Sequence, residues 1–116
     1  MNITIIPASS TPVAEITGSG IIINTLSDAL DIIGNAGYQG AGRVIIYEEN
    51  ITPDFFDLKT GLAGEILQKF STYTMQLAIV GDFSKYTSKA LKDFIYESNK
   101  TGGINFVASR EEALLR

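Results

Sequence analysis

In the last two thirds of the chain, short apolar runs alternate with segments of helical periodicity. The apolar runs cover residues 44–47, 75–80 and 104–108, and turn-forming residues bound each of them, as they bound buried parallel strands. The segments between them, 61–72 and roughly 86–98, repeat apolar residues at the spacing of an amphipathic helix. This alternation is typical of a parallel sheet with helices packed against it.

The first third of the chain has the pattern of a hairpin followed by a helix. Residues 2–6 and 12–17 predict two strands joined by the polar connection 8–11. Residues 21–23 predict a brief third strand or a strand continuation, and Thr25 is the expected N-cap of the first helix. We therefore expect an α/β fold: a single mixed, mostly parallel sheet of about four or five strands with helices packed on it and an N-terminal hairpin.

Three shorter signals complete the predicted order of elements. Residues 53–57 predict a short helical turn that begins with proline. Residues 99–103 predict a loop before the last strand. Ser109 and Glu112 form a capping-box pattern in front of a final helical segment over 113–115.

The length and composition fit one domain over residues 1–116. Hydrophobic residues make up 45% of the chain and charged residues 19%, an ordinary balance for a globular protein. A chain of 116 residues can bury a self-sufficient core, and no repeat or low-complexity linker divides it.

The sequence contains no cysteine and no histidine. The missing cysteines exclude disulfides, thiolate metal sites and thiol nucleophiles. The missing histidines exclude the usual general base near neutral pH and every Ser-His arrangement. No Walker motif or dinucleotide fingerprint is present either. We therefore expect a protein that is not an enzyme and that carries no cofactor.

The charge argues against polyanionic partners. The net charge is −4, and residues 1–58 hold seven acidic side chains against one basic side chain. A molecule with this charge repels nucleic acid and anionic membranes, so we expect neither as a partner. The first residues lack the basic region of a signal peptide, and no apolar stretch approaches the length of a membrane span. These features predict a cytoplasmic protein.

Acidic residues follow two predicted neighbouring strands. Glu48 and Glu49 come after one strand and Asp82 after the next, and Asp57 could lie on the same edge. Ligands of open α/β sheets bind outside the carboxyl ends of the strands. Converging carboxylates there could bind a small ligand, hold Mg²⁺ or act as an acid and base. The alternative is that they are solvated loop charges and turn supports.

Phe55 and Phe56 are adjacent near this edge. Two neighbouring rings are not expected to face one core, so one of them could cover a pocket or contact a partner. The alternative places one ring on each side of a layer.

The order of elements and one motif resemble a known fold. Residues 43–47, the segment Asp57-Leu58-Lys59-Thr60-Gly61-Leu62, and the strands near 77–81 and 106–109 are similar to the anti-sigma-factor-antagonist (STAS) fold. The segments FFDLKTGLAGEILQKF and LAIVGDFSKYTSKALKDFIYESNK more closely resemble a family of small bacterial proteins of undefined function. The first resemblance implies a STAS-like domain, and the second, which is the stronger match, implies little chemistry.

The STAS resemblance implies a switch at Thr60. In phosphorylated STAS regulators the hydroxyl just before the glycine accepts phosphate, and Thr60 stands before Gly61 here. A phosphate at a helix N-terminus meets free backbone N–H groups and the positive end of the dipole. The segment from Asp57 is one residue longer than the family pattern, and Lys59 replaces a hydroxyl. The alternative is that Thr60 caps the following helix.

Three functions remain open from the sequence. The first is a non-catalytic regulatory module that docks a protein partner near Thr60. The second is a small-ligand-binding domain that uses the edge around Glu48, Asp57 and Asp82. The third is a magnesium-assisted enzyme that uses the same carboxylates. The edge strand of the hairpin could also pair across a two-fold axis to form a homodimer.

Overall fold

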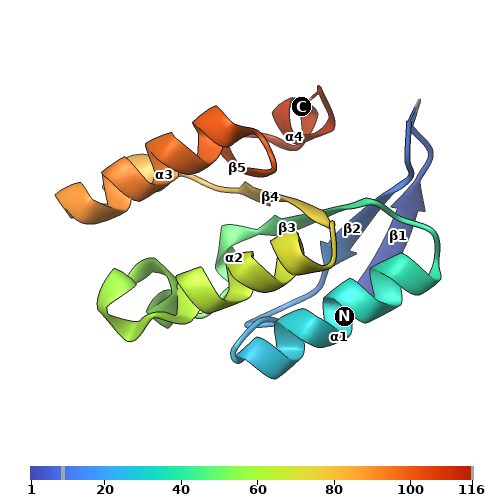
Figure 1. Cartoon of the computed structure of the whole chain (residues 1–116), viewed down its shortest axis with the longest axis horizontal. Helices are drawn as coiled ribbons and strands as arrows, with labels where there is room; N and C mark the ends of the chain where they lie inside the picture. Colours follow the sequence, from blue (N-terminus) through green and yellow to red (C-terminus); the bar gives the residue numbers. More distant parts are fainter. Residues whose placement is uncertain (9, 116) are drawn as a thin grey trace.

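The computed structural model describes residues 1–8 and 10–115, and it shows one mixed sheet with helices on both faces (Figure 1). The strands are β1 (Asn2–Ile6), β2 (Val13–Thr17), β3 (Arg43–Tyr47), β4 (Gln76–Val80) and β5 (Ile104–Val107). The helices are α1 (Leu26–Tyr38), α2 (Leu62–Thr72), α3 (Lys89–Thr101) and α4 (Arg110–Leu115). Four 3₁₀ turns link them: η1 (Glu48–Asn50), η2 (Pro53–Phe56), η3 (Leu58–Thr60) and η4 (Phe83–Lys85).

The strands lie in the sheet in their chain order, β1-β2-β3-β4-β5. β1 and β2 form an antiparallel hairpin, and β2 to β5 are parallel. A helix connects each parallel strand to its neighbour, which is the expected way to join parallel strands. The α/β fold, the single mixed sheet and the N-terminal hairpin predicted from the sequence are confirmed, and the sheet has five strands where four or five were expected. The predicted connection 8–11 includes Ser9, which lies outside the described residues.

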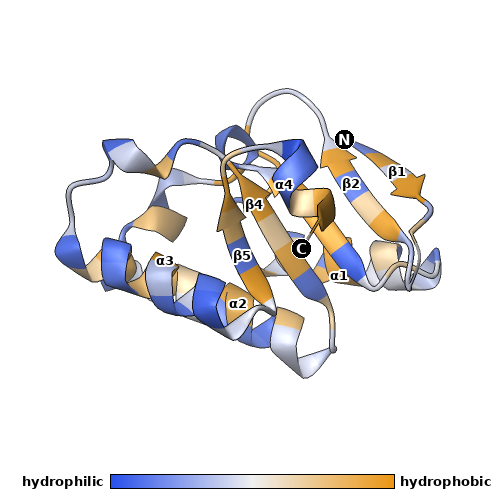
Figure 2. Cartoon of the chain, turned by 90° about the horizontal axis from the view of Figure 1, so that it is seen from above, coloured by the Kyte–Doolittle hydropathy of each residue, from blue (hydrophilic) through white to orange (hydrophobic). Residues whose placement is uncertain are grey.

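The two faces of the sheet are covered unequally. One face packs against α1, α2 and α3 in the main core, which includes Ala29, Ile66 and Leu91. The other face forms a smaller core with α4, in which Ala113 packs on Ile45 and its neighbours. Figure 2 shows α4 in front of the sheet and α1 behind it. Alternate residues of a strand point to opposite faces, so apolar residues on both faces of β3 and β4 explain their continuous apolar sequences.

Polar contacts hold α4 over the second face. Glu15 on β2, whose side chain is 11% exposed, receives hydrogen bonds from Arg110 Nε at 2.9 Å and from Tyr47 Oη at 2.6 Å. Arg43 Nη1 donates to the Ala113 carbonyl at 2.7 Å. Burial alone would raise the pKa of Glu15, but the hydrogen bonds from Arg110 and Tyr47 outweigh it and hold this pKa below its usual range. Burial and the bond to Glu15 raise the pKa of Tyr47 to about 12.

Two predicted elements differ from the structure. Residues 21–23 do not form a third strand, and Ile23 makes a single bridge to Ile51 because its N–H is bonded to the Asn50 carbonyl at 2.9 Å. The predicted loop 99–103 is wrong at its start, because α3 continues to Thr101 before Gly102 ends it in the left-handed conformation.

Caps at Thr25 and Ser88 set the starts of α1 and α3. The capping box between Thr25 and Asp28 is formed as predicted. α3 starts later than predicted, at Lys89, where the Ser88 hydroxyl accepts a hydrogen bond from the Leu91 N–H at 3.2 Å. Across residues 1–8 and 10–115, no helix combines the length and the apolarity that crossing a bilayer requires.

Candidate functional site

Glu48 follows β3 at the carboxyl end of the sheet and has two partners. Its carboxylate accepts a short hydrogen bond from the Tyr86 hydroxyl and forms an ion pair with Lys85 Nζ at 2.9 Å. The Glu48 side chain is 11% exposed, so the pair is largely shielded from water on the glutamate side. Burial, followed by the bond to Glu48, raises the pKa of Tyr86 above its ordinary range. Tyr86 therefore keeps its proton and acts as a donor.

Gly81 makes room for Glu48. A Cβ atom placed on Gly81 would lie 2.6 Å from Glu48 Cβ, a distance that real side chains do not adopt. Gly81 directly follows β4, the strand next to β3, so the two chain ends pass close to each other. Only a residue without a side chain allows this approach.

Some of the predicted edge residues share a cavity. It has a volume of about 240 Å³ and lies beside the Glu48–Tyr86–Lys85 cluster. Its lining residues are Ile21, Glu48, Glu49, Ile51, Pro53, Phe56, Lys85 and Tyr86. The structure thus brings Glu48, Glu49 and Phe56 together, as the sequence predicted for a ligand-binding edge. Lys85 and Tyr86, which the sequence did not single out, also line this cavity.

Asp82 and Asp57 serve other turns. Asp82 lines a neighbouring cavity of about 460 Å³, where its carboxylate accepts hydrogen bonds from Ser84 Oγ at 2.6 Å and from the Ser84 N–H at 3.1 Å. These bonds from Ser84 lower the pKa of Asp82. Asp57 caps η3 and accepts from the Lys59 N–H at 3.2 Å. In the part of the chain that the structure describes, no three acidic side chains gather as a metal site would need.

Phe55 and Phe56 do not divide between two layers, and neither is a free lid. Both rings belong to the main core, with exposures of 2% and 7%, and their centroids lie 5.0 Å apart in an edge-to-face arrangement. A 3₁₀ turn places successive side chains about a third of a turn apart. From η2, Phe55 can therefore contact Phe106 while Phe56 stacks on Tyr86, with the two ring centroids 5.2 Å apart. The expectation that two adjacent rings cannot face one core was wrong.

The Thr60 hydroxyl is exposed but bonded. It lies 2.7 Å from the Asp54 carbonyl and 2.9 Å from the Asp57 carbonyl, and it accepts from the Leu62 N–H at 3.2 Å. The N-cap of α2 is Gly61, whose φ of 77° is left-handed. Thr60 therefore satisfies one of the first N–H groups of α2 from outside the cap position, which differs slightly from the predicted cap. The hydroxyl is at the surface and at the start of a helix, as the STAS resemblance implies.

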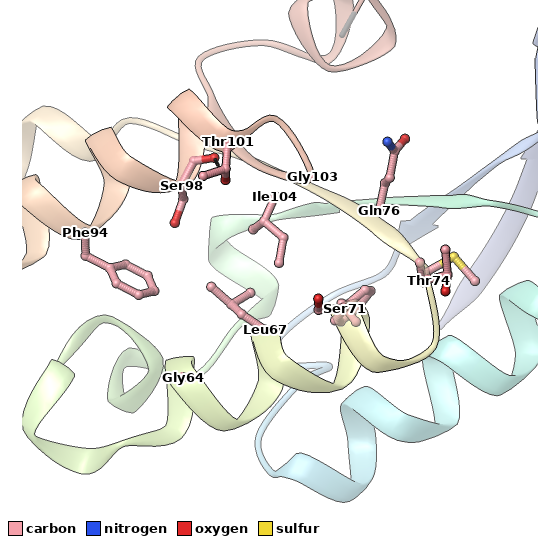
Figure 3. A pocket seen from close by; sticks show the side chains of 12 residues that line it. Gly64, Leu67, Ser71, Thr74, Gln76, Phe94, Ser98, Thr101, Gly103 and Ile104 are labelled. Atoms are coloured by element: carbon pink, nitrogen blue, oxygen red, sulfur yellow. Dashed lines mark hydrogen bonds between the residues drawn. The ribbon is translucent and has the colours of Figure 1, made fainter.

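A groove that the sequence did not indicate lies between α2 and α3 (Figure 3). Its volume is about 560 Å³, and its lining residues are Gly64, Leu67, Phe70, Ser71, Thr74, Met75, Gln76, Phe94, Ser98, Thr101, Gly103 and Ile104. The groove contains apolar side chains from both helices and from β5, with hydroxyl groups from both helices, and none of its lining residues is charged. Such a lining favours an apolar ligand that makes a few hydrogen bonds.

The groove exists because α3 buries little of its own surface. Of the residues of α3, all of which the structure describes, only Leu91 is fully buried, whereas Phe94 and Ile95 are partly exposed. Ser98 and Thr101 continue the face of Phe94 at spacings of four and seven residues. In the sequence, the signal for the groove was this change along one face of α3, from apolar to small polar residues halfway along the helix.

Comparison with known proteins assigns the chain to a family. A family model described as "Domain of unknown function (DUF4180)" matches residues 8–116, nearly the whole chain. Comparison with curated proteins and with solved structures gives no match. The match covers every element from β2 to α4, including the groove and the Glu48 cluster. The chain therefore belongs to the family of this domain of unknown function, DUF4180.

Proposed function

We propose that the protein is a non-catalytic interaction module that binds an apolar segment of a partner protein in the groove between α2 and α3. The observation that carries the proposal is the groove itself: it is uncharged and is bounded by two helices. Leu67, Phe70 and Met75 in its lining are well packed, with exposures of 8% or less, so they form a rigid floor under the partly exposed Phe94 and Ile104. A preformed apolar surface lowers the entropic cost of binding.

The chemistry of the lining selects the kind of partner segment. Phe94 and Ile104 are partly exposed apolar residues that two or three apolar side chains could cover. The Ser71 and Ser98 hydroxyls can donate to or accept from the backbone of such a segment. The Thr101 hydroxyl donates to the Ser98 carbonyl at 3.0 Å and can still accept. Amphipathic helices bind in grooves of this kind through a few apolar anchors.

Thr60 is the proposed switch of this module. It directly precedes Gly61 and α2, and α2 forms one wall of the groove. A phosphate on Thr60 would remove the hydroxyl proton that the Asp54 and Asp57 carbonyls accept and would add a charge of about −2 beside the start of α2. The turn that positions α2 would then rearrange. The resemblance to STAS regulators supports this position as the modified one.

We further propose that this module is STAS-like, bacterial and cytoplasmic. The order of elements supports a STAS-like architecture. The segment resemblance supports a bacterial origin, and the negative net charge supports a cytoplasmic regulator that binds neither nucleic acid nor membrane.

A pair of surface variants tests the groove. Ser71→Arg places a long charged side chain in the groove from an exposed position, so we expect it to abolish partner capture. Gln68→Arg adds the same charge to an exposed position of α2 outside the groove lining and is the matched control. Tagged wild-type, Ser71→Arg and Gln68→Arg proteins are purified from the native host and their co-purifying proteins quantified by mass spectrometry. A stoichiometric partner that both variants retain, or no partner at all, contradicts the proposal.

The switch is tested with the partner that this purification identifies. Thr60→Glu adds a negative charge and removes the hydroxyl, so we expect partner affinity to change by at least about fivefold. Thr60→Ser keeps the hydroxyl and is the control that should bind like the wild type. Equal affinity of Thr60→Glu and wild type in a titration would refute the switch without affecting the groove.

A second candidate function is small-ligand binding at the Glu48 cavity. The favouring observation is the charged pair of Glu48 and Lys85 beside a cavity of about 240 Å³. A small polar ligand with both a donor and an acceptor could use the two groups. Mass spectrometry under native and denaturing conditions tests this: a bound molecule adds a discrete mass that denaturation removes. Its loss in Lys85→Met would assign it to this cavity.

A further inference from the structure

The two outer strands of the sheet differ in whether the backbone groups on their outer edge are covered. At the β5 edge, the Asn99 side chain accepts from the Phe106 N–H at 2.7 Å and donates to the Phe106 carbonyl at 3.1 Å. This amide takes the place of a neighbouring strand, so β5 cannot pair with another chain at that residue. β5 is thereby a protected edge.

β1 is the other outer strand, and it lies at the margin of the sheet in Figure 2. Within residues 1–8 and 10–115, β2 is its only strand partner. Exposed edge strands are commonly protected by a charged residue, a proline or a bulge. β1 has none of these: its five residues, Asn2 to Ile6, carry no charge, and Pro7 lies beyond the strand.

The sequence of β1 is suited to pairing with itself. We propose that β1 pairs antiparallel with β1 of a second copy of this chain, across a two-fold axis at Thr4, and extends the sheet through both subunits. This register places Ile3 opposite Ile5 of the second copy and Thr4 opposite its counterpart. Ile3 and Ile5 are partly buried on the main-core face, so the isoleucine pairs would continue that apolar surface across the axis.

The charges near β1 permit this approach. Glu15 lies directly beside Thr4 in the hairpin register. Its carboxylate is bound to Arg110 and Tyr47, so it presents no free negative charge to the second copy. A five-residue strand buries less surface than a stable obligate dimer requires, so the expected dimer is reversible.

Thr4 gives a selective test. Two copies of Thr4→Lys would place like charges opposite each other at the axis, and we expect the dimer dissociation constant to rise roughly tenfold or more. Within one subunit, Thr4 is exposed, so the fold should tolerate the lysine, which circular dichroism checks. Gln68→Lys adds the same charge on exposed α2 and should behave like the wild type. Sedimentation equilibrium from micromolar to millimolar concentration measures the mass against the 12.5 kDa of one chain.

Cross-linking provides a second readout that does not depend on added charge. The chain contains no cysteine, so Thr4→Cys introduces a single thiol at the proposed axis. Mild oxidation should convert this variant to a covalent dimer, whereas Gln68→Cys should stay monomeric under the same conditions.

Three results would each overturn the proposal: a wild-type protein that remains monomeric up to millimolar concentration, a Thr4→Lys variant that dimerises like the wild type, or a Thr4→Cys variant that fails to cross-link. None of them bears on partner binding in the α2–α3 groove, so this proposal and the proposed function fail separately.

Discussion

Single residues at the carboxyl end of the sheet show the clearest link between sequence and geometry. Glu48 can lie beside Tyr86 and Lys85 because Gly81, directly after the neighbouring strand β4, has no side chain in its way. From the sequence alone, Gly81 indicated only the end of a strand. Its contact with Glu48 depends on the register between β3 and β4, which no local pattern encodes.

Replacing Gly81 tests this contact. Gly81→Ala should destabilise the fold by about 1–3 kcal/mol, because the new methyl group would collide with Glu48 Cβ. Gly34→Ala is the matched control: Gly34 lies within α1 with open space around its Cα, so alanine should stabilise by about 0.5–1 kcal/mol. Urea denaturation of both variants measures the difference, and equal stabilities would show that the close approach is absent.

The Glu15 cluster predicts a pH dependence. Because the folded state holds the pKa of Glu15 below its reference value of 4.5, the carboxylate stabilises the fold above that value. This stabilisation is lost as the pH falls through the folded pKa. Glu15→Gln should cost about 1–2 kcal/mol at pH 7 because it weakens the contacts with Arg110 and Tyr47.

The difference in unfolding free energy between Glu15→Gln and the wild type should therefore depend on pH. This difference, measured by denaturation, should be full at pH 7 and should shrink as the pH falls below 4.5. Because Arg110 is 47% exposed, added salt should reduce the difference at pH 7. A difference that stays constant from pH 7 to pH 3 would contradict the assigned role of the carboxylate.

At the scale of elements, the hydrophobic pattern predicted the strands and helices well, because each main-core helix buries one face and the central strands β3 and β4 are apolar on both faces. The three helices of the main core and the three central strands occur where apolar spacing placed them, within a few residues. The 3₁₀ turns at η1 to η4 were mostly missed. They are set by local capping from Asp57 and Asp82 and by contacts with Phe56 and Tyr86 rather than by periodicity.

The start of α2 offers an element-level prediction. Gly61 has a φ of 77°, so Gly61→Ala should destabilise the protein by about 1–2 kcal/mol. Gly61→Asn should cost less, because asparagine adopts the left-handed conformation more readily. Thermal denaturation compares the two, and an alanine variant as stable as the asparagine variant would show that the turn before α2 can relax.

At the scale of the whole molecule, the sequence predicted the sheet and its hairpin but only part of the site. Glu48, Glu49 and Phe56 meet as expected, whereas Asp57 and Asp82 stabilise separate turns. The α2–α3 groove was missed: the change from apolar to small polar residues along one face of α3 was its only sequence signal, and its size depends on how far two helices diverge over a twisted sheet. Helix spacing is set by the sum of many contacts and not by a motif.

The separation of the carboxylates predicts the response to divalent cations. The melting temperature in millimolar magnesium or manganese chloride should equal the melting temperature in sodium chloride of the same ionic strength. The physical reason is that Glu48, Asp57 and Asp82 are each engaged at a different turn. A concentration-dependent rise specific to the divalent cation would restore the magnesium-assisted enzyme as a candidate.

The central claim is that a partner binds in the α2–α3 groove. Hydrogen exchange read by mass spectrometry, on the free protein and on the complex with its purified partner, tests this most directly. We predict slower exchange in peptides covering residues 64–76 and 94–104, with β1 and α4 unchanged. Slower exchange confined to the Glu48 turn, to β1 or to α4 would contradict the claim.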